Sequence, residues 1–216
     1  IDINCGCPST RIVGNEAGSY LLKNPEKIAS MIRNLKDHGL TVTAKIRLGF
    51  KNNNVMEVSK VVEKAGADLL TIHARTAQQK YSDSPDWDWI AKVKNEIGIP
   101  VVGNGGIVNG ETASRMLDIC DGAMVASAAI GNPFIFRNIL GYLKSGKEKE
   151  VTKEDRLNGL LDYVKLAEKH DVFEISRVKY IGSNFLKGFD GASSARERLM
   201  RVKSVVDVKE MLKTLV

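Results

Sequence analysis

The sequence predicts an α/β protein in which parallel strands alternate with helices. Short β-rich runs recur along the first 127 residues, and they are largely apolar on both faces, as strands of a covered parallel sheet must be. The segments between these runs have apolar residues at helical spacing. Polar residues lie near the carboxyl ends of several runs. A repeated β-α order implies parallel pairing through helical crossovers.

The boundaries of the elements follow from local signals. Asn24-Pro25 is typical of a helix start, with Asn as the cap and Pro at the first helical position. Ser84-Pro85 repeats that signal, and Gly98 marks the end of the helix that follows. The expected strands are 1–4, 42–48, 69–74, 100–105 and 122–127. The expected helices between them are 24–38, 54–66, 85–97 and 110–119.

Two architectures fit this order, an open doubly wound sheet and a (β/α)8 TIM barrel. Lys45, His73, Asn104 and Ser127 each fall near the carboxyl end of a different strand, which is how barrels assemble an active site. The last two strands end in glycine-rich loops, as in the phosphate sites after barrel strands seven and eight. We therefore expect a barrel whose strands four to eight are present, whose first three are missing, and whose sequence is a fragment.

The alternation stops after residue 133, and the rest of the sequence predicts helices. Residues 132–145 are expected to form the helix after strand eight, and the polar stretch 145–155 a linker. A helical bundle is then expected from helices at about 155–170, 174–187 and 193 onward. The predicted domains are residues 1–146, the barrel part, and residues 147–216, the bundle.

Charge and composition narrow the functional classes. The net charge is +6, and from Arg137 onward 17 Lys and Arg stand against 12 Asp and Glu. This excess indicates either an anionic partner such as nucleic acid or a solvated helical surface. No apolar run approaches the roughly 18 residues of a membrane span, and no signal peptide is evident. Three cysteines argue against a disulfide framework and favour a reducing compartment, the cytoplasm.

Cys7 is the first candidate for chemistry. Gly6 and Pro8 flank it in an expected turn after a strand, and a loop through Gly18 follows. A buried cysteine is ordinarily a passive core residue, but at the end of a barrel strand this thiol would face the mouth. C-x-C occurs once without a second ligand pair, so no metal site is expected. The core role and the catalytic role both stay open.

Charged residues within expected strands are the next candidates. Lys45 is costly to bury unpaired, so it needs an anionic or electron-rich partner. His73 is equally well interpreted as a satisfied core histidine or as a functional group. Arg47 and Arg75 lie two residues further along their strands and would either pair with carboxylates or face an anionic ligand.

Two glycine-rich loops indicate a phosphorylated cofactor. Gly103 to Gly106 leaves backbone N–H groups unobstructed at a strand end, near a helix start. The second loop, residues 126–131, consists largely of small residues that permit close approach. Either loop alone is weak evidence, and the pair on adjacent strands is stronger.

Together these segments resemble the tRNA-dihydrouridine synthases, a family of flavin-dependent (β/α)8 enzymes. The resemblance covers nearly the whole chain. It is carried in order by "DINCGCPSTRIVGNEAGSYLL", "AKIRLG", "TIHARTAQQKYSDSPDWDWI", "VVGNGGI", "AMVASAAIGNPFIF" and "SRVKYIGSNFLKGFDGASSARERL". No single segment is specific, but their joint occurrence is.

The resemblance implies a reaction and a set of site residues. NADPH would reduce bound FMN, flavin N5 would deliver hydride to C6 of a uracil in tRNA, and Cys7 would protonate C5. A hydride donor and a proton donor are what reduction of a conjugated C=C bond needs. The implied FMN contacts are Lys45, His73, Asn104, Gly105, Gly106, Ala126 and Ser127. The implied uracil contacts are Asn4 and Tyr81, and the implied tRNA phosphate contacts include Arg177, Lys179, Arg196 and Arg198.

Two residues depart from the family pattern. Gly106 replaces the usual acidic residue after Asn-Gly, and Ser127 replaces the usual arginine on strand eight. Backbone N–H groups would tolerate both changes, whereas a phosphate site that depends on the arginine would be weakened. The alternatives are therefore another FMN barrel oxidoreductase acting on a small molecule and a non-catalytic RNA-binding paralogue.

Overall fold

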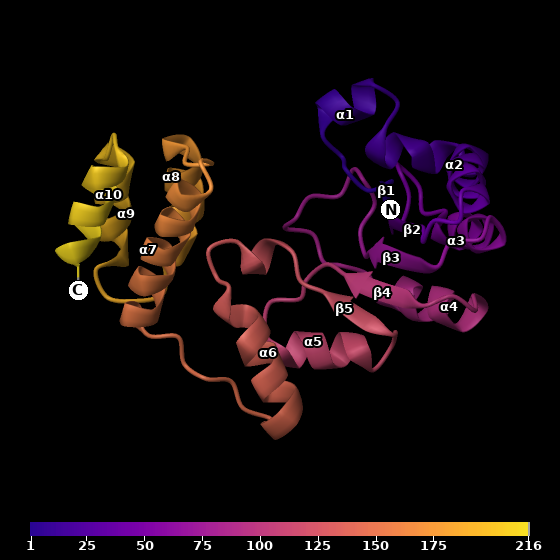
Figure 1. Cartoon of the computed structure of the whole chain (residues 1–216). Coiled ribbons are helices and arrows are strands. Elements are labelled where there is room, and N and C mark those ends of the chain that lie inside the picture. Colours follow the sequence, from indigo (N-terminus) through magenta and orange to yellow (C-terminus); the bar gives the residue numbers. More distant parts are fainter. Residues whose placement is uncertain (216) are drawn as a thin grey trace. The chain divides into compact units, whose positions relative to one another are not determined.

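The computed structural model describes residues 1–215, which divide into two compact units (Figure 1). The first unit runs from Ile1 to Ala126 and the second begins at Ser127. Residues 127–146 thus cluster with the helical unit, partly because Phe134 packs on the core of that unit. The predicted domain boundary after residue 146 stays a proposal.

The first unit is built on one parallel sheet, which confirms the predicted β-α order. Its strands pair in sequence order, β1-β2-β3-β4-β5. Their bounds are Asp2–Asn4, Thr43–Arg47, Leu69–His73, Val101–Asn104 and Gly122–Met124. This five-stranded sheet with helical crossovers is consistent with a TIM-type barrel, whose closure is a proposal.

The two faces of the sheet differ. Helices α2 (Pro25–Asp37), α3 (Val55–Lys64), α4 (Asp88–Glu96) and α5 (Gly110–Leu117) follow successive strands and cover one face (Figure 1). The side chains beneath these helices, such as Ile46 and Ile72, are fully buried. The alternate residues point to the other face because side chains alternate along a strand. They include Lys45 and His73. The face under the helices is therefore apolar as expected, whereas the other face carries polar side chains.

Two local expectations in the first unit are wrong. Helix α4 begins at Asp88, because the Asp86 N–H donates to the Ala74 carbonyl (2.8 Å) and holds the preceding segment as an extended loop. The loop expected after Cys7 contains a short helix α1 (Thr10–Gly14) and a 3-10 helix η1 (Gly18–Lys23). The Asn24 cap is confirmed, since its side chain accepts the Lys27 N–H.

The second unit is helical, as predicted. It contains η2 (Ser127–Ala129), α6 (Phe134–Ser145), α7 (Lys153–Lys169), α8 (Ile175–Phe185), α9 (Ala192–Arg201) and α10 (Val205–Lys213). Leu160, Val178, Leu199 and Val208 are fully buried in its core. The single last helix that the sequence predicted is two helices, because Ser204 caps α10 in a reciprocal arrangement with Asp207.

No helix within residues 1–215 is both long and apolar enough to cross a membrane.

Candidate functional site

The carboxyl ends of the strands bring polar side chains from distant parts of the sequence together. Asn4 lies beside Lys45 in the β1–β2 register. One layer further along, Arg47 lies beside His73, and His73 lies beside Asn104. Neighbouring residues in register share a face of the sheet, so these five side chains form one polar surface. The expected convergence of strand ends is confirmed for Lys45, His73 and Asn104, whereas Ser127 lies in η2, beyond the end of β5 at Met124.

The backbone around Cys7 is held from several directions. The Asn4 side-chain oxygen, Oδ1, accepts the N–H groups of Gly6 and Cys7, each at 3.0 Å. The Ser19 N–H donates to the Cys7 carbonyl at 3.0 Å. This arrangement is an Asx-type turn, which Asn and Asp side chains favour. The thiol therefore projects from a loop with little conformational freedom.

The neighbouring cysteines occupy opposite environments. Cys5 is fully buried, and burial, with a smaller contribution from Asp2, raises the pKa of its thiol to about 12. Cys120 is also buried, and burial raises its pKa. Cys7 is half-buried, so it is the accessible thiol among residues 1–215. The geometry favours Cys7 over Cys5 for chemistry, since only an accessible thiol can meet a substrate.

Lys45 and His73 are two bases on this surface whose pKa values are lowered. Burial, and then repulsion from Arg47, lowers the pKa of the Lys45 ammonium, while Asp2 opposes the shift. Burial is also the main cause that lowers the pKa of His73 to about 3, followed by the charges of Arg47 and Lys45. His73 is thus a neutral imidazole near pH 7. Its Nδ1 is buried without a hydrogen-bond partner, which is unusual for a side chain only 6% exposed.

Arg47 and Arg75 do not pair with carboxylates as one expectation had it, because both donate to backbone carbonyls, and their facing an anionic ligand stays a prediction. Arg47 bonds the carbonyls of Gly6 (2.8 Å) and Thr76 (2.9 Å). Arg75 bonds the carbonyls of Asp83 (2.7 Å) and Tyr81 (3.1 Å). Both side chains are nearly buried, at 5% and 6% exposed. The sequence signal was their position two residues beyond Lys45 and His73, which does not reveal their partners.

Tyr81 stands at the edge of the same surface. Its side chain is 73% exposed, and its ring meets the His73 ring edge-on, with ring centroids 6.3 Å apart. The Arg75 bond to its carbonyl fixes the backbone of this loop. An exposed aromatic ring beside the half-buried thiol loop is suited to contact a planar base.

The glycine-rich loop after β4 is held by an unforeseen partner. The Trp87 Nε1–H donates to the Gly105 carbonyl at 2.8 Å, and the Asn104 Nδ2–H donates to the Met124 carbonyl at 2.7 Å. Gly106 has φ +78°, and a Cβ there would lie 2.8 Å from Pro85 Cγ. A side chain at position 106 would therefore collide with Pro85.

The remaining expected cofactor contacts are less defined by geometry. Ala126 is exposed just beyond β5, at the end of the first unit. Ser127 is exposed and begins the second unit. Their roles stay predictions. Among residues 1–215, no group of three or more His, Cys, Asp or Glu side chains is arranged to hold a metal ion.

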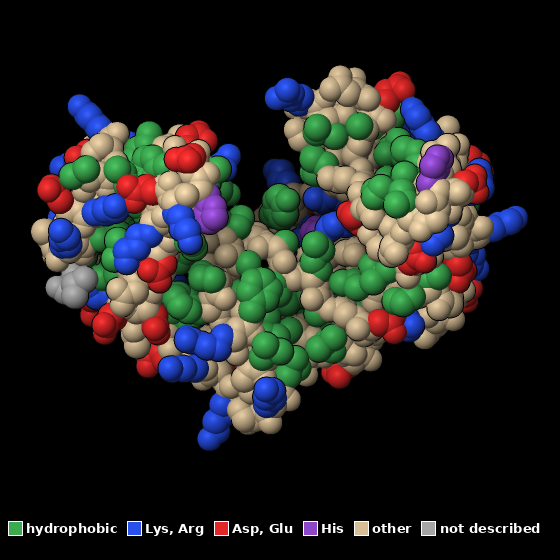
Figure 2. Space-filling model, in the orientation of Figure 1, with side chains coloured by type: hydrophobic (Ala, Val, Ile, Leu, Met, Phe, Trp, Pro, Cys, Tyr) green, Lys and Arg blue, Asp and Glu red, His purple; other side chains and the backbone are tan. Residues whose placement is uncertain are grey.

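The predicted phosphate contacts in the helical unit differ in how engaged they are. Arg196 donates to the Leu186 carbonyl at 2.6 Å, and Arg198 donates to the Thr214 hydroxyl. Arg177 lies 3.7 Å from Glu174 in an exposed ion pair. Lys179 is half-buried on α8. On the face shown in Figure 2, basic and acidic side chains are interspersed over this unit.

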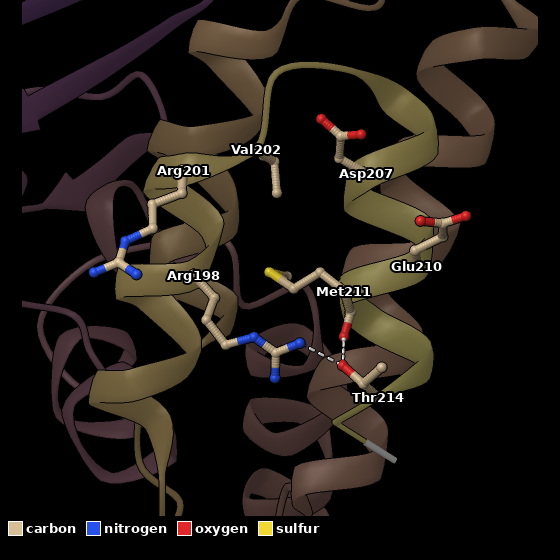
Figure 3. Close-up of a pocket in the computed structure, with 7 residues that line it drawn as sticks. All are labelled: Arg198, Arg201, Val202, Asp207, Glu210, Met211 and Thr214. Atoms are coloured by element: carbon tan, nitrogen blue, oxygen red, sulfur yellow. Dashed lines mark hydrogen bonds between the residues drawn. The ribbon is translucent and has the colours of Figure 1, made fainter.

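A cleft of about 400 Å³ separates α9 from α10 (Figure 3). Its lining residues are Arg198, Arg201, Val202, Asp207, Glu210, Met211 and Thr214. The arginines extend from α9, whereas the two carboxylates are on α10 (Figure 3). Because both charge signs line it, the cleft is not a simple anion site. Arg198 is among the phosphate contacts that the resemblance implies, whereas no pattern in the sequence indicates the cleft.

The dihydrouridine synthase family model matches residues 1–216. The chain belongs to this family. A probable tRNA-dihydrouridine synthase of Aquifex aeolicus is 32% identical over 222 residues, which cover 99% of this chain and 68% of the relative. A probable tRNA-dihydrouridine synthase 1 of Synechocystis sp. is 32% identical over 219 residues, covering 98% and 62%. One from Rickettsia conorii is 35% identical over 189 residues, covering 79% and 57%.

The matched segments thus span between 57% and 68% of the length of these three relatives. The family model, by contrast, matches this chain over its whole length.

Proposed function

We propose that this protein is a tRNA-dihydrouridine synthase that reduces the C5=C6 bond of uridines in tRNA, with FMN as cofactor and NADPH as reductant. The observation that carries the proposal is the placement of Cys7, an accessible thiol beside the polar surface of Lys45 and His73, in a chain of the dihydrouridine synthase family. In a closed barrel, β1 to β5 would take positions four to eight.

The residues present fit a phosphorylated flavin. Lys45 and the two buried arginines give the surface a positive charge, and none of these three side chains forms an ion pair with a carboxylate within the described residues, although Asp2 is near enough to act on Lys45. His73 adds a buried Nδ1 that a ligand would satisfy. Lys45 and His73 would hold the ring system, and Asn104, Gly105, Gly106, Ala126 and Ser127 the phosphate end. When bound, the flavin supplies the hydride.

Asn4 presents a single kind of hydrogen-bonding group to a base. Its Oδ1 is engaged by two backbone N–H groups, which fixes the side-chain amide with Nδ2 as the outward donor. A donor at this position pairs with a uracil carbonyl oxygen and not with the uracil N3–H. Tyr81 would hold the base from the other loop. Cys7 would then give its proton to C5.

The helical unit would bind the tRNA backbone. Arg177 and Lys179 would reach phosphates most readily, because Arg177 has only an exposed ion pair with Glu174 at 3.7 Å to exchange, whereas Arg196 and Arg198 donate hydrogen bonds to groups of their own unit. The target base must leave the folded RNA to reach a site at strand ends, at a cost of roughly a few kcal/mol.

The test is to express the protein, with any residues encoded upstream of Ile1, and to measure dihydrouridine in tRNA with NADPH. The wild type should form the product, Cys7→Ala should not, and Cys5→Ala is the matched control. A Cys7→Ala variant with full activity would exclude the proton-donor role.

The changes at Gly106 and Ser127 give specific support to a non-catalytic RNA-binding paralogue as second candidate. Such a protein would purify without colour, whereas a visible flavin absorbance band contradicts it. A flavin reductase acting on a small molecule would keep its activity after deletion of residues from about 150 onward, whereas activity on tRNA would be lost.

A further inference from the structure

A single side chain links the two loops that carry the proposed reaction. These are the Cys7 loop, residues 5–9, and the Tyr81 loop, residues 76–83. Arg47 on β2 donates from Nε to the Gly6 carbonyl at 2.8 Å and from Nη1 to the Thr76 carbonyl at 2.9 Å. Gly6 immediately precedes Cys7. Thr76 begins the loop that leads to Tyr81. The two acceptors belong to segments far apart in the sequence, so this guanidinium is a direct bridge between the loops.

Each loop also has ties of its own, and these do not reach the other loop. The Cys7 loop is held by Asn4 and Ser19. The Tyr81 loop is held by Arg75, through the carbonyls of Asp83 and Tyr81. Without Arg47, each loop would keep these contacts but would lose the hydrogen bonds that join it to the other loop.

The residue type matches this task. Arginine carries several donors in a rigid planar fork, so it can hold two carbonyls at a fixed separation, whereas the single ammonium of lysine cannot. Burying a cation without a carboxylate partner is costly. Arg47 is nevertheless only 5% exposed and spends its donors on backbone carbonyls.

The guanidinium is also within electrostatic reach of both functional side chains. Burial lowers the pKa of Arg47, and its interactions with Tyr81, which include a side-chain hydrogen bond, and with Cys7 oppose that shift. The Arg47 guanidinium thus interacts with a side chain from each loop.

We propose that Arg47 is a positioning residue that holds the Cys7 loop and the Tyr81 loop in one arrangement, so that the proton donor and the base-holding ring meet the same uracil. Arg47 would act through the backbone carbonyls of the two loops and through its side-chain hydrogen bond to Tyr81. This inference rests on the proposed function for its consequence, but the mechanical link can be tested without RNA or flavin.

The first experiment measures hydrogen exchange in residues 5–9 and 76–83 of the purified protein. Arg47→Lys keeps the charge and removes the fork, and exchange in both segments should accelerate on the order of tenfold as charge-assisted bonds are lost. Arg75→Lys is the matched control, since it should accelerate only residues 76–83. If Arg47→Lys accelerates one segment alone, or neither, the link does not exist.

Cys5 reports whether the variant keeps its fold. This thiol is fully buried two residues from Cys7, so it should resist alkylation in Arg47→Lys as in the wild type while Cys7 reacts. If Cys5 becomes reactive, the exchange experiment is repeated with Arg47→Gln, which removes the buried charge and the fork together. The same two-segment result is then required, and its absence overturns the proposal.

The second experiment separates positioning from binding. Arg47→Lys should lower kcat for tRNA by about 100-fold, because small misplacements of reacting groups have effects of that size, and should leave KM within about threefold. A raised KM with unchanged kcat would show a binding role and contradict positioning. If the wild type forms no dihydrouridine, the proposed function fails, and hydrogen exchange still decides the link.

Discussion

Arg47 and Arg75 in the sheet-bearing unit and Arg177 in the helical unit carry the same guanidinium in opposite surroundings. The first two are nearly buried and hold backbone carbonyls of loops. Arg177 is exposed and lies 3.7 Å from Glu174. A buried cation must be satisfied in one geometry, whereas an exposed one exchanges partners with water and salt.

The comparison indicates where each unit concentrates its specificity. The sheet unit fixes a few groups in place, as preorganised catalysis requires. The helical unit offers many weakly engaged charges, as binding to a phosphate backbone requires. Changes in the first unit should therefore have large, local effects, and single changes in the second should have small ones.

The largest effect is expected at Cys7. Cys7→Ser should lower dihydrouridine formation by about 100- to 10,000-fold, because a general acid contributes that much. Cys5→Ser should leave the rate within a fewfold, since the Cys5 thiol is buried and its pKa is raised to about 12. Single-turnover rates on tRNA measure both. Equal losses would show that the two thiols do not differ as their surroundings indicate.

A pH effect is expected from His73 in the cofactor-free protein. The pKa of the folded-state imidazole is about 3 and that of the unfolded one 6.5, so protons bind the unfolded state first as pH falls. The stabilisation is full above pH 6.5 and is lost from there towards pH 3. At pH 5 the free energy of unfolding should be lower by about 2 kcal/mol.

Urea unfolding of the wild type and His73→Gln at pH 7.5 and 5 measures this contribution. The pH dependence of the wild type should exceed that of the variant by this amount. Identical pH dependence would show that the pKa of His73 in the folded protein is the same as in the unfolded chain.

A smaller effect is expected at Gly106. Gly106→Asp restores the residue type usual in the family, but it places a Cβ 2.8 Å from Pro85 Cγ at φ +78°. We expect a loss of about 1–3 kcal/mol in unfolding free energy. Gly39→Asp is the matched control, because φ is +72° there and nothing lies within 4 Å of the added Cβ. Equal losses in the two variants would show that the contact with Pro85 does not cause the destabilisation.

The smallest effect is expected at a single cation of the helical unit. Lys179→Ala should weaken tRNA binding a fewfold and reduce the salt slope of log Kd by about one. Lys64→Ala, an exposed cation at the end of α3, serves as control and should change neither quantity. Fluorescence anisotropy over a salt series measures both. A hundredfold loss from Lys179→Ala would place a specific contact where we expect a diffuse one.

Much of this fold was determined by sequence alone. Apolar periodicity set the five strands and the order of the helices, because the β-α repeat has few parallel solutions. The Gly-Cys-Pro context selected Cys7 over Cys5, and the strand-end positions of Lys45 and His73 predicted their convergence. These are consequences of local pattern and of the parallel sheet.

Tertiary structure decided the rest. The partners of Arg47 are carbonyls at Gly6 and Thr76, and no local pattern encodes which distant carbonyl a buried arginine meets. The start of α4 at Asp88 depends on a bond to Ala74, which overrides the Ser-Pro signal. Sequence fixes which groups are present and on which face of an element they lie, whereas hydrogen bonds between distant loops depend on how the whole sheet packs.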